Sequence, residues 1–117
     1  VAFIVTARSA TAIATELGMS ALVEAHDERE VEMAFRAEAS IIGVNNRNLK
    51  TFTVDINNSA RYRKMVPKEV AFVSESGIKT AEDIAKLLEN GTDAVLIGET
   101  LMRSANKKQA LDELRGI

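Results

Sequence analysis

The chain has 117 residues, 46% apolar and 27% charged, which is the balance of an ordinary globular domain. No run of 18 apolar residues offers a transmembrane span, so no membrane association is expected. With 17 acidic residues, 15 basic residues and 4% aromatics, the chain lacks the basic surface and the stacking platform that nucleic acid requires. The absence of cysteine excludes disulfides and thiolate metal sites, and it fits a reducing, cytoplasmic setting.

Apolar runs rich in β-branched residues predict five strands, at Ala2–Val5, Ala21–Val23, Ile41–Val44, Val70–Val73 and Ala94–Ile97. The runs are nearly continuous rather than alternating, a pattern typical of strands buried on both faces of a parallel sheet. The chain opens on Val1 without Met and without the features of a signal peptide. Because it enters the first predicted strand at once, we expect it to be a piece of a longer protein.

The segments between the runs have helical spacing. Apolar residues recur at i, i+3 and i+4 after the second and fourth runs, and a similar stripe follows the last run. Asp27 with Glu30, and Thr80 with Asp83, predict capped helix starts. Glycines at 18 and 91 predict helix ends. The stretch Arg8–Leu17 allows only two to three turns, which is short for a crossover, so part of a helix is expected to be missing there.

A strand followed by a helix, repeated five times, requires parallel strands joined by helical crossovers. Two α/β architectures satisfy this order, an open doubly wound sheet and a (β/α)8 TIM barrel. A whole barrel needs about 250 residues, so five units can supply only part of one. We predict that residues 1–117 form a single domain.

Polar residues follow four successive runs, at the end of the sheet where parallel α/β folds bind ligands. They are Glu24, then Asn45 to Arg47, then Ser74 to Gly77, and finally Gly98 to Thr100. Gly77 and Gly98 stand at the ends of neighbouring strands, where a missing side chain lets backbone N–H groups approach an anion. Together they predict a phosphate site.

The motifs in these positions resemble those of one enzyme family. The segments LVEAH (22–26), IIGVNNRNL (41–49), VSESGI (73–78) and VLIGETLM (95–102) are similar, in this order, to the strand motifs of indole-3-glycerol phosphate synthase. The resemblance covers nearly the whole chain, and it implies strands four to eight of a (β/α)8 barrel. It also implies a cofactor-free carboxy-lyase of tryptophan biosynthesis. That enzyme closes the indole ring of 1-(2-carboxyphenylamino)-1-deoxyribulose 5-phosphate with loss of CO2 and water.

Carried over position by position, the resemblance implies catalytic roles for Glu24, Asn45, Glu75 and Ser76. It implies substrate binding by Arg47, Leu49, Gly77, Ile97, Gly98 and Glu99, the last through its amide, and no metal or cofactor. The lysines of the family's first three strands have no counterpart here. We therefore expect this chain to hold the phosphorylated small-molecule substrate but to be inactive alone. Its expected partner is the missing N-terminal half-barrel or a second copy.

Other interpretations stay open at this stage. The chain could be a non-catalytic half-barrel, natural or engineered, that binds a phosphorylated ligand or self-associates through its unpaired strand edges. Phosphoribosyl isomerases share the phosphate corner, although the NNR-x-L motif argues against them. Single residues also have structural interpretations: a solvated charge for Glu24, a loop-fixing pair with Asp55 or Glu75 for Arg47, a loop or cap role for His26 and a surface position for Lys79.

Overall fold

A computed structural model describes the backbone of residues 2–117 and the side chains of residues 6–117. One parallel sheet has its strands in chain order: β1 (Val23–Ala25), β2 (Ile41–Asn45), β3 (Ala71–Glu75) and β4 (Ala94–Leu96). The helices are α1 (Ala2–Glu16), α2 (Glu28–Arg36), α3 (Asn57–Arg63), α4 (Ala81–Glu89), α5 (Glu99–Arg103) and α6 (Lys107–Arg115). Strands and helices alternate from β1 to α5, so the predicted partial (β/α)8 barrel is confirmed as the fold class.

The predicted first strand is wrong, because Ala2–Val5 lies within helix α1. Short apolar runs do not distinguish a strand from a helix by period alone. Here the run continues into an alanine-rich stretch without Gly or Pro before Gly18, which favours one long helix. Helix α1 occupies the segment in which a short crossover was expected. The second predicted strand is also displaced, from Ala21–Val23 to β1, Val23–Ala25.

Local capping explains where the helices start. The Thr80 hydroxyl accepts from the Asp83 N–H at 3.2 Å, and the Asp83 carboxylate accepts from the Thr80 N–H at 3.1 Å, which completes the predicted capping box of α4. Asp27 caps α2 by accepting from the Glu30 N–H at 2.8 Å. The Glu30 carboxylate reaches one residue further back and accepts from the His26 N–H at 2.7 Å. No described helix is both long and apolar enough to cross a membrane.

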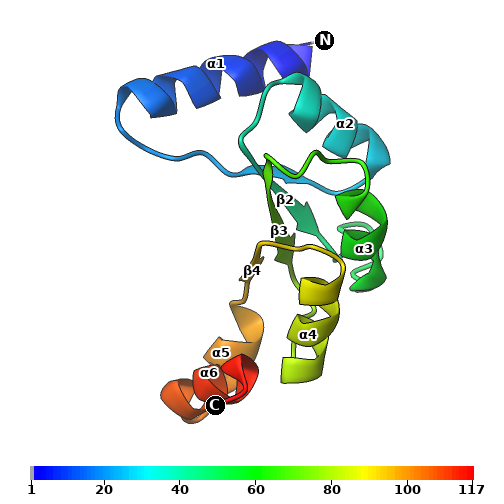
Figure 1. The fold of residues 1–117 in the computed structure, drawn as a ribbon, viewed down its shortest axis with the longest axis vertical. Helices are drawn as coiled ribbons and strands as arrows, with labels where there is room; N and C mark the ends of the chain where they lie inside the picture. Colours follow the sequence, from blue (N-terminus) through cyan, green and yellow to red (C-terminus); the bar gives the residue numbers. More distant parts are fainter. Residues whose placement is uncertain (1) are drawn as a thin grey trace.

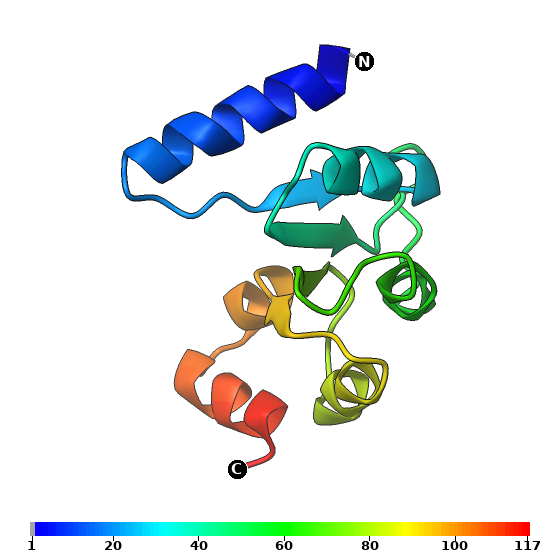
Figure 2. The same ribbon diagram turned by 45° about the horizontal axis from the view of Figure 1, so that its top comes forward.

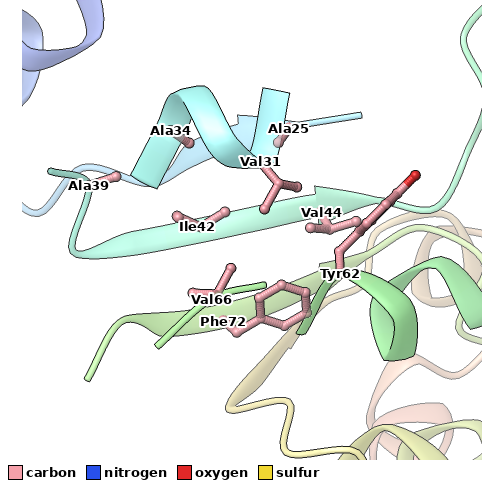
Figure 3. Close-up of a cluster of buried hydrophobic side chains, with 9 residues drawn as sticks. All are labelled: Ala25, Val31, Ala34, Ala39, Ile42, Val44, Tyr62, Val66 and Phe72. Carbon is pink, nitrogen blue, oxygen red and sulfur yellow. The ribbon is translucent and has the colours of Figure 1, made fainter. Parts of the chain in front are cut away.

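The hydrophobic core lies between the sheet and the helices that cover one of its faces. Figure 1 shows α2, α3 and α4 on the same side of the strands, and Figure 3 shows the buried side chains gathered there. The cluster contains Ala25, Val31, Ala34, Ala39, Ile42, Val44, Tyr62, Val66 and Phe72. Because side chains alternate along a strand, the intervening residues of β1, β2 and β3 point to the opposite face.

In the part of the chain that the structure describes, α2, α3 and α4 leave that opposite face uncovered. On β1 and β4 the side chains of Glu24 and Leu96 are exposed, and Leu96 keeps 57% of its surface accessible. The radius of gyration is 15.0 Å, against about 13 Å expected for a compact domain of this length. The two ends of the chain lie at opposite ends of the molecule in both ribbon views (Figures 1 and 2). The described chain is thus an open arc with β1 and β4 as its edge strands.

Candidate functional site

A cleft of about 1130 Å³ lies at the carboxyl ends of the strands, and its lining includes residues of α5. Every predicted site residue except Leu49 lines it: Glu24, Asn45, Arg47, Glu75, Ser76, Gly77, Ile97, Gly98 and Glu99. The strand register explains the convergence. Asn45 pairs with Glu75, Glu75 pairs with Leu96, and Glu24 pairs with Gly43 two residues before Asn45. These side chains therefore point from the same face of the sheet.

Two carboxyl groups meet at the inner end of this cleft. Burial of Glu75 raises the pKa of its carboxyl from 4.5 to about 7, and the nearby charge of Glu24 and a hydrogen bond with Glu24 act in the same direction. The His26 charge acts in the opposite direction. Asn45 Nδ2 donates to Glu24 Oε1 at 2.8 Å. A carboxyl with a pKa near 7 can exchange a proton at neutral pH, so the pair is suited to general acid–base chemistry.

Gly43 provides the space that the carboxyl pair needs. A Cβ built on Gly43 would overlap Glu75 Oε1 and would lie 2.7 Å from Leu22 Cδ2. The missing side chain on β2 thus lets the Glu75 carboxyl occupy the sheet face beside Glu24. Gly43 belongs to the second motif of the sequence, although it was not among the predicted site residues.

Three charged side chains form a bridge across the outer part of the cleft. Arg47 Nη2 lies 2.7 Å from Glu99 Oε2, and Arg103 Nε lies 3.1 Å from Glu99 Oε1. The hydrogen bond from Arg47, its charge and the charge of Arg103 hold the pKa of the Glu99 carboxyl below its ordinary value. Arg47 therefore does not pair with Asp55 or Glu75. Arg103 was missed, although the i, i+4 spacing of Glu99 and Arg103 is the usual signature of such a pair.

The predicted phosphate corner brings together two loops. Thr100 Oγ1 donates to the Ile78 carbonyl at 2.7 Å and so ties the loop after β3 to the start of α5. Within residues 2–117, the N–H groups of Gly77 and Gly98 donate to no protein acceptor. Glu99 opens α5, and the first N–H groups of a helix have no acceptor within it. These amides are available to a ligand.

The loop between Asn46 and Asp55 explains why Leu49 is outside the cleft. The Asp55 N–H donates to the Asn46 carbonyl at 3.0 Å, which closes the loop at its base. Leu49 lies at the tip with 56% of its surface exposed, whereas Val54 on the returning limb lines the cleft. The described chain therefore does not bring Leu49 to the cleft. The lining also includes residues that were not predicted: Val54, Ile56, Ile78, Lys79, Asp83, Leu96, Thr100 and Arg103.

The remaining polar candidates have local partners. His26 Nδ1 lies 3.0 Å from Glu30 Oε2 and His26 Nε2 lies 3.5 Å from Glu24 Oε1, so its ring bridges the cap of α2 to the cleft. The Lys79 N–H donates to Asp83 at the start of α4, while its exposed side chain borders the cleft. Among residues 2–117, no three His, Cys, Asp or Glu side chains converge in a way that could hold a metal ion.

Solved structures with a similar arrangement of elements share little sequence identity with this chain. One chain of the Amycolatopsis orientalis BexX/CysO complex aligns over 97% of this chain and 45% of its own, with a TM-score of 0.71 and 18% identity. The YdjI aldolase from Escherichia coli K12 aligns over 96% of this chain and 48% of its own, with a TM-score of 0.60 and 20% identity. At these identities the likeness concerns the fold alone.

Sequence relatives are much closer. The indole-3-glycerol phosphate synthase of Ruminiclostridium cellulolyticum is 62% identical over 104 residues, and that of Leuconostoc mesenteroides is 54% identical over 104 residues. Each alignment covers 89% of this chain and 40% of the relative, so the chain spans about 40% of the length of these curated relatives. The family model of indole-3-glycerol phosphate synthase matches residues 5–114. The family model covers most of the chain, and the four strand motifs meet in one cleft. The chain therefore belongs to the indole-3-glycerol phosphate synthase family.

Proposed function

We propose that this chain is the phosphate-binding part of an indole-3-glycerol phosphate synthase. In the complete barrel it would take part in closing the indole ring of 1-(2-carboxyphenylamino)-1-deoxyribulose 5-phosphate, with loss of CO2 and water. The observation that carries the proposal is the convergence of Glu24, Asn45 and Glu75 in one cleft with the free amides of Gly77 and Gly98.

Each group has a role in this reaction that its surroundings support. The Glu24–Glu75 pair would move a proton, because burial and mutual repulsion keep a carboxyl pKa near 7. Asn45, held by Glu24, would orient the aromatic part of the substrate. The amides of Gly77, Gly98 and Glu99 would bind the phosphate, and Arg47 and Arg103 would supply nearby positive charge. Ser76 and Ile97 would complete the walls of the cleft.

Phosphate binding can be tested on this chain directly. We expect inorganic phosphate to shift the amide resonances of Gly77, Gly98 and Glu99 in a titration followed by ¹H–¹⁵N NMR. Glu99→Gln should strengthen binding about two- to fivefold, because it removes a nearby negative charge and frees both arginines from their ion pairs. Glu89→Gln, an exposed carboxylate on α4, is the matched control. Saturable shifts confined to other surfaces would contradict the assignment of the phosphate corner.

The enzymatic role needs a complete barrel. We suggest joining this chain to the preceding residues of the Ruminiclostridium cellulolyticum relative, which is 62% identical over the shared part. This chimera should close the indole ring, and Glu24→Gln in it should lower kcat by about 10²-fold or more while changing KM little. If kcat falls less than about threefold, a shift of under 1 kcal/mol in the barrier, Glu24 is a solvated charge.

A second candidate function, in which the chain acts by assembling with a partner, is favoured by a specific observation. The sheet face opposite the helices is open and partly apolar, with Leu22 43% and Leu96 57% exposed, and β1 and β4 leave unpaired edges. Either the N-terminal half of a barrel or a second copy of this chain would cover this surface. Sedimentation analysis over a range of concentrations, with and without a separately made N-terminal half, distinguishes these two partners.

A further inference from the structure

A closed ring of three polar side chains lies behind the cleft, in the layer between the sheet and α3. Asn46, Ser59 and Ser74 are each at most 1% exposed. Asn46 Nδ2 donates to Ser74 Oγ at 2.9 Å, and the Ser59 hydroxyl donates to Asn46 Oδ1 at 2.9 Å. The two serine oxygens lie 2.6 Å apart. A hydroxyl has one hydrogen, and that of Ser59 is already used, so Ser74 must donate to Ser59.

The side-chain amide of Asn46 keeps one hydrogen that is not used inside the ring. Asn46 Nδ2 has two hydrogens, and the second is donated to the Ser76 carbonyl at 3.0 Å. Because the ring fixes which way the Asn46 amide faces, the NH2 group cannot turn away from Ser76 without breaking two other buried bonds. The backbone N–H of Asn46 also donates to the Glu75 carbonyl at 2.8 Å. Asn46 therefore holds consecutive carbonyls at the end of β3.

The segment held in this way has an unusual backbone. Ser76 has a φ of 69°, in the left-handed region that residues with a Cβ disfavour, and Gly77 follows with a φ of 79°. Such a conformation persists in a non-glycine residue only where its surroundings enforce it. Gly77 also has Val54 packed so closely that a Cβ at this position would overlap the Val54 side chain. The turn carries Ser76 and the Gly77 amide into the cleft.

We propose that Asn46 is a positioning residue, which acts through its hydrogen bond to the Ser76 carbonyl to hold the left-handed Ser76–Gly77 turn in the geometry that receives phosphate. Asn46 is not part of the cleft lining, so it acts without touching the ligand. The inference rests on the proposed phosphate site for its functional consequence. The effect of Asn46 on the Ser76–Gly77 turn does not depend on whether phosphate binds there.

The test uses the 117-residue chain, inorganic phosphate and three variants. Asn46→Ala removes the donor to Ser76. Asn46→Leu does the same with nearly the original side-chain shape and leaves the Ser59–Ser74 bond in place, in case the alanine variant does not fold. Ser59→Ala is the matched control, because it opens the same buried ring without touching Ser76. Two readouts are taken by NMR: the phosphate Kd, and the Ser76 φ from its ³J(HN–Hα) coupling and backbone chemical shifts.

We expect both Asn46 variants to lose the left-handed Ser76 conformation and to weaken phosphate binding about tenfold or more, the scale of one buried hydrogen bond. Ser59→Ala should keep the turn and change the Kd by less than about threefold, even though it also loses buried hydrogen bonds. Retention of the turn in the Asn46 variants, or equal loss in Ser59→Ala, would overturn the proposal. Failure of the unsubstituted chain to bind phosphate would instead reject the phosphate site, and the Ser76 coupling would still decide the role of Asn46.

Discussion

The Glu75 carboxyl gives the chain a specific pH dependence. Its pKa of about 7 in the folded chain exceeds the ordinary 4.5, so between these values the folded state binds more protons than the unfolded state. The stability that this group contributes is fully present below about pH 4.5 and is lost as the pH rises through 7. Urea unfolding should therefore show a larger fall in stability between pH 5 and pH 8 for the unsubstituted chain than for Glu75→Gln. The difference should be on the order of 1–3 kcal/mol.

Glu89→Gln serves as the control for this measurement, because Glu89 is an exposed carboxylate far along α4. It should leave the pH dependence of the unsubstituted chain intact. If Glu75→Gln also leaves it intact, the protons are taken up elsewhere, and the Glu24–Glu75 pair does not share a proton near neutral pH.

Arg63, the last residue of α3, links this helix to two loops of the chain. The Arg63 side chain is 9% exposed, its Nε donates to the Gly91 carbonyl at 2.8 Å, and its Nη1 donates to the Val66 carbonyl at 2.9 Å. The guanidinium also lies 5.5 Å from the centre of the Phe72 ring. Arg63→Leu should lower the free energy of unfolding by about 2–4 kcal/mol, because it removes the donor to the buried Val66 carbonyl and to the partly buried Gly91 carbonyl.

Arg61 on the same helix provides the comparison for Arg63. It is exposed and bonds to the side chains of its neighbours Asn58 and Tyr62. Arg61→Leu should change stability by no more than about 0.5 kcal/mol in the same chemical denaturation experiment. Equal losses of stability for both variants would mean that Arg63 stabilises the fold through its charge and not through these hydrogen bonds.

The success of sequence-based prediction differed between elements for physical reasons. The run Ile41–Val44 predicted β2 well, because Ile42, Gly43 and Val44 of this central strand are all buried. The run Ala2–Val5 was predicted as a strand but forms the start of helix α1. Four consecutive apolar residues are too few to show either the period of a strand or that of a helix. Strand-end residues such as Glu24 and Glu75 were found because parallel strands present their carboxyl ends together. The role of Ser59 could not be found, because nothing in the sequence pairs a serine of α3 with Asn46.

At the scale of the whole molecule, we expect this chain to show no synthase turnover by itself. The cleft lies on the sheet face opposite α2, α3 and α4, and the chain covers only 40% of the length of its relatives. Loss of a positioned acid alone should cost about 10²–10⁴-fold, and an open site adds the cost of admitting water. The measurement is indole-ring closure by the purified chain, prepared from a host that lacks its own enzyme. Turnover within about tenfold of the chimera would show that the described residues form a complete active site.

The strand order of the sheet has a consequence for how the molecule can be made. Each strand pairs only with the strand before and the strand after it in the chain, in the order β1-β2-β3-β4. During synthesis from the N-terminus, each of the strands β2, β3 and β4 finds the strand that it pairs with already emerged. Among the described strands, the outer edges of β1 and of the most recent strand then remain unpaired. The arc can therefore grow one strand–helix unit at a time on the ribosome, with the phosphate corner among the last parts to be assembled.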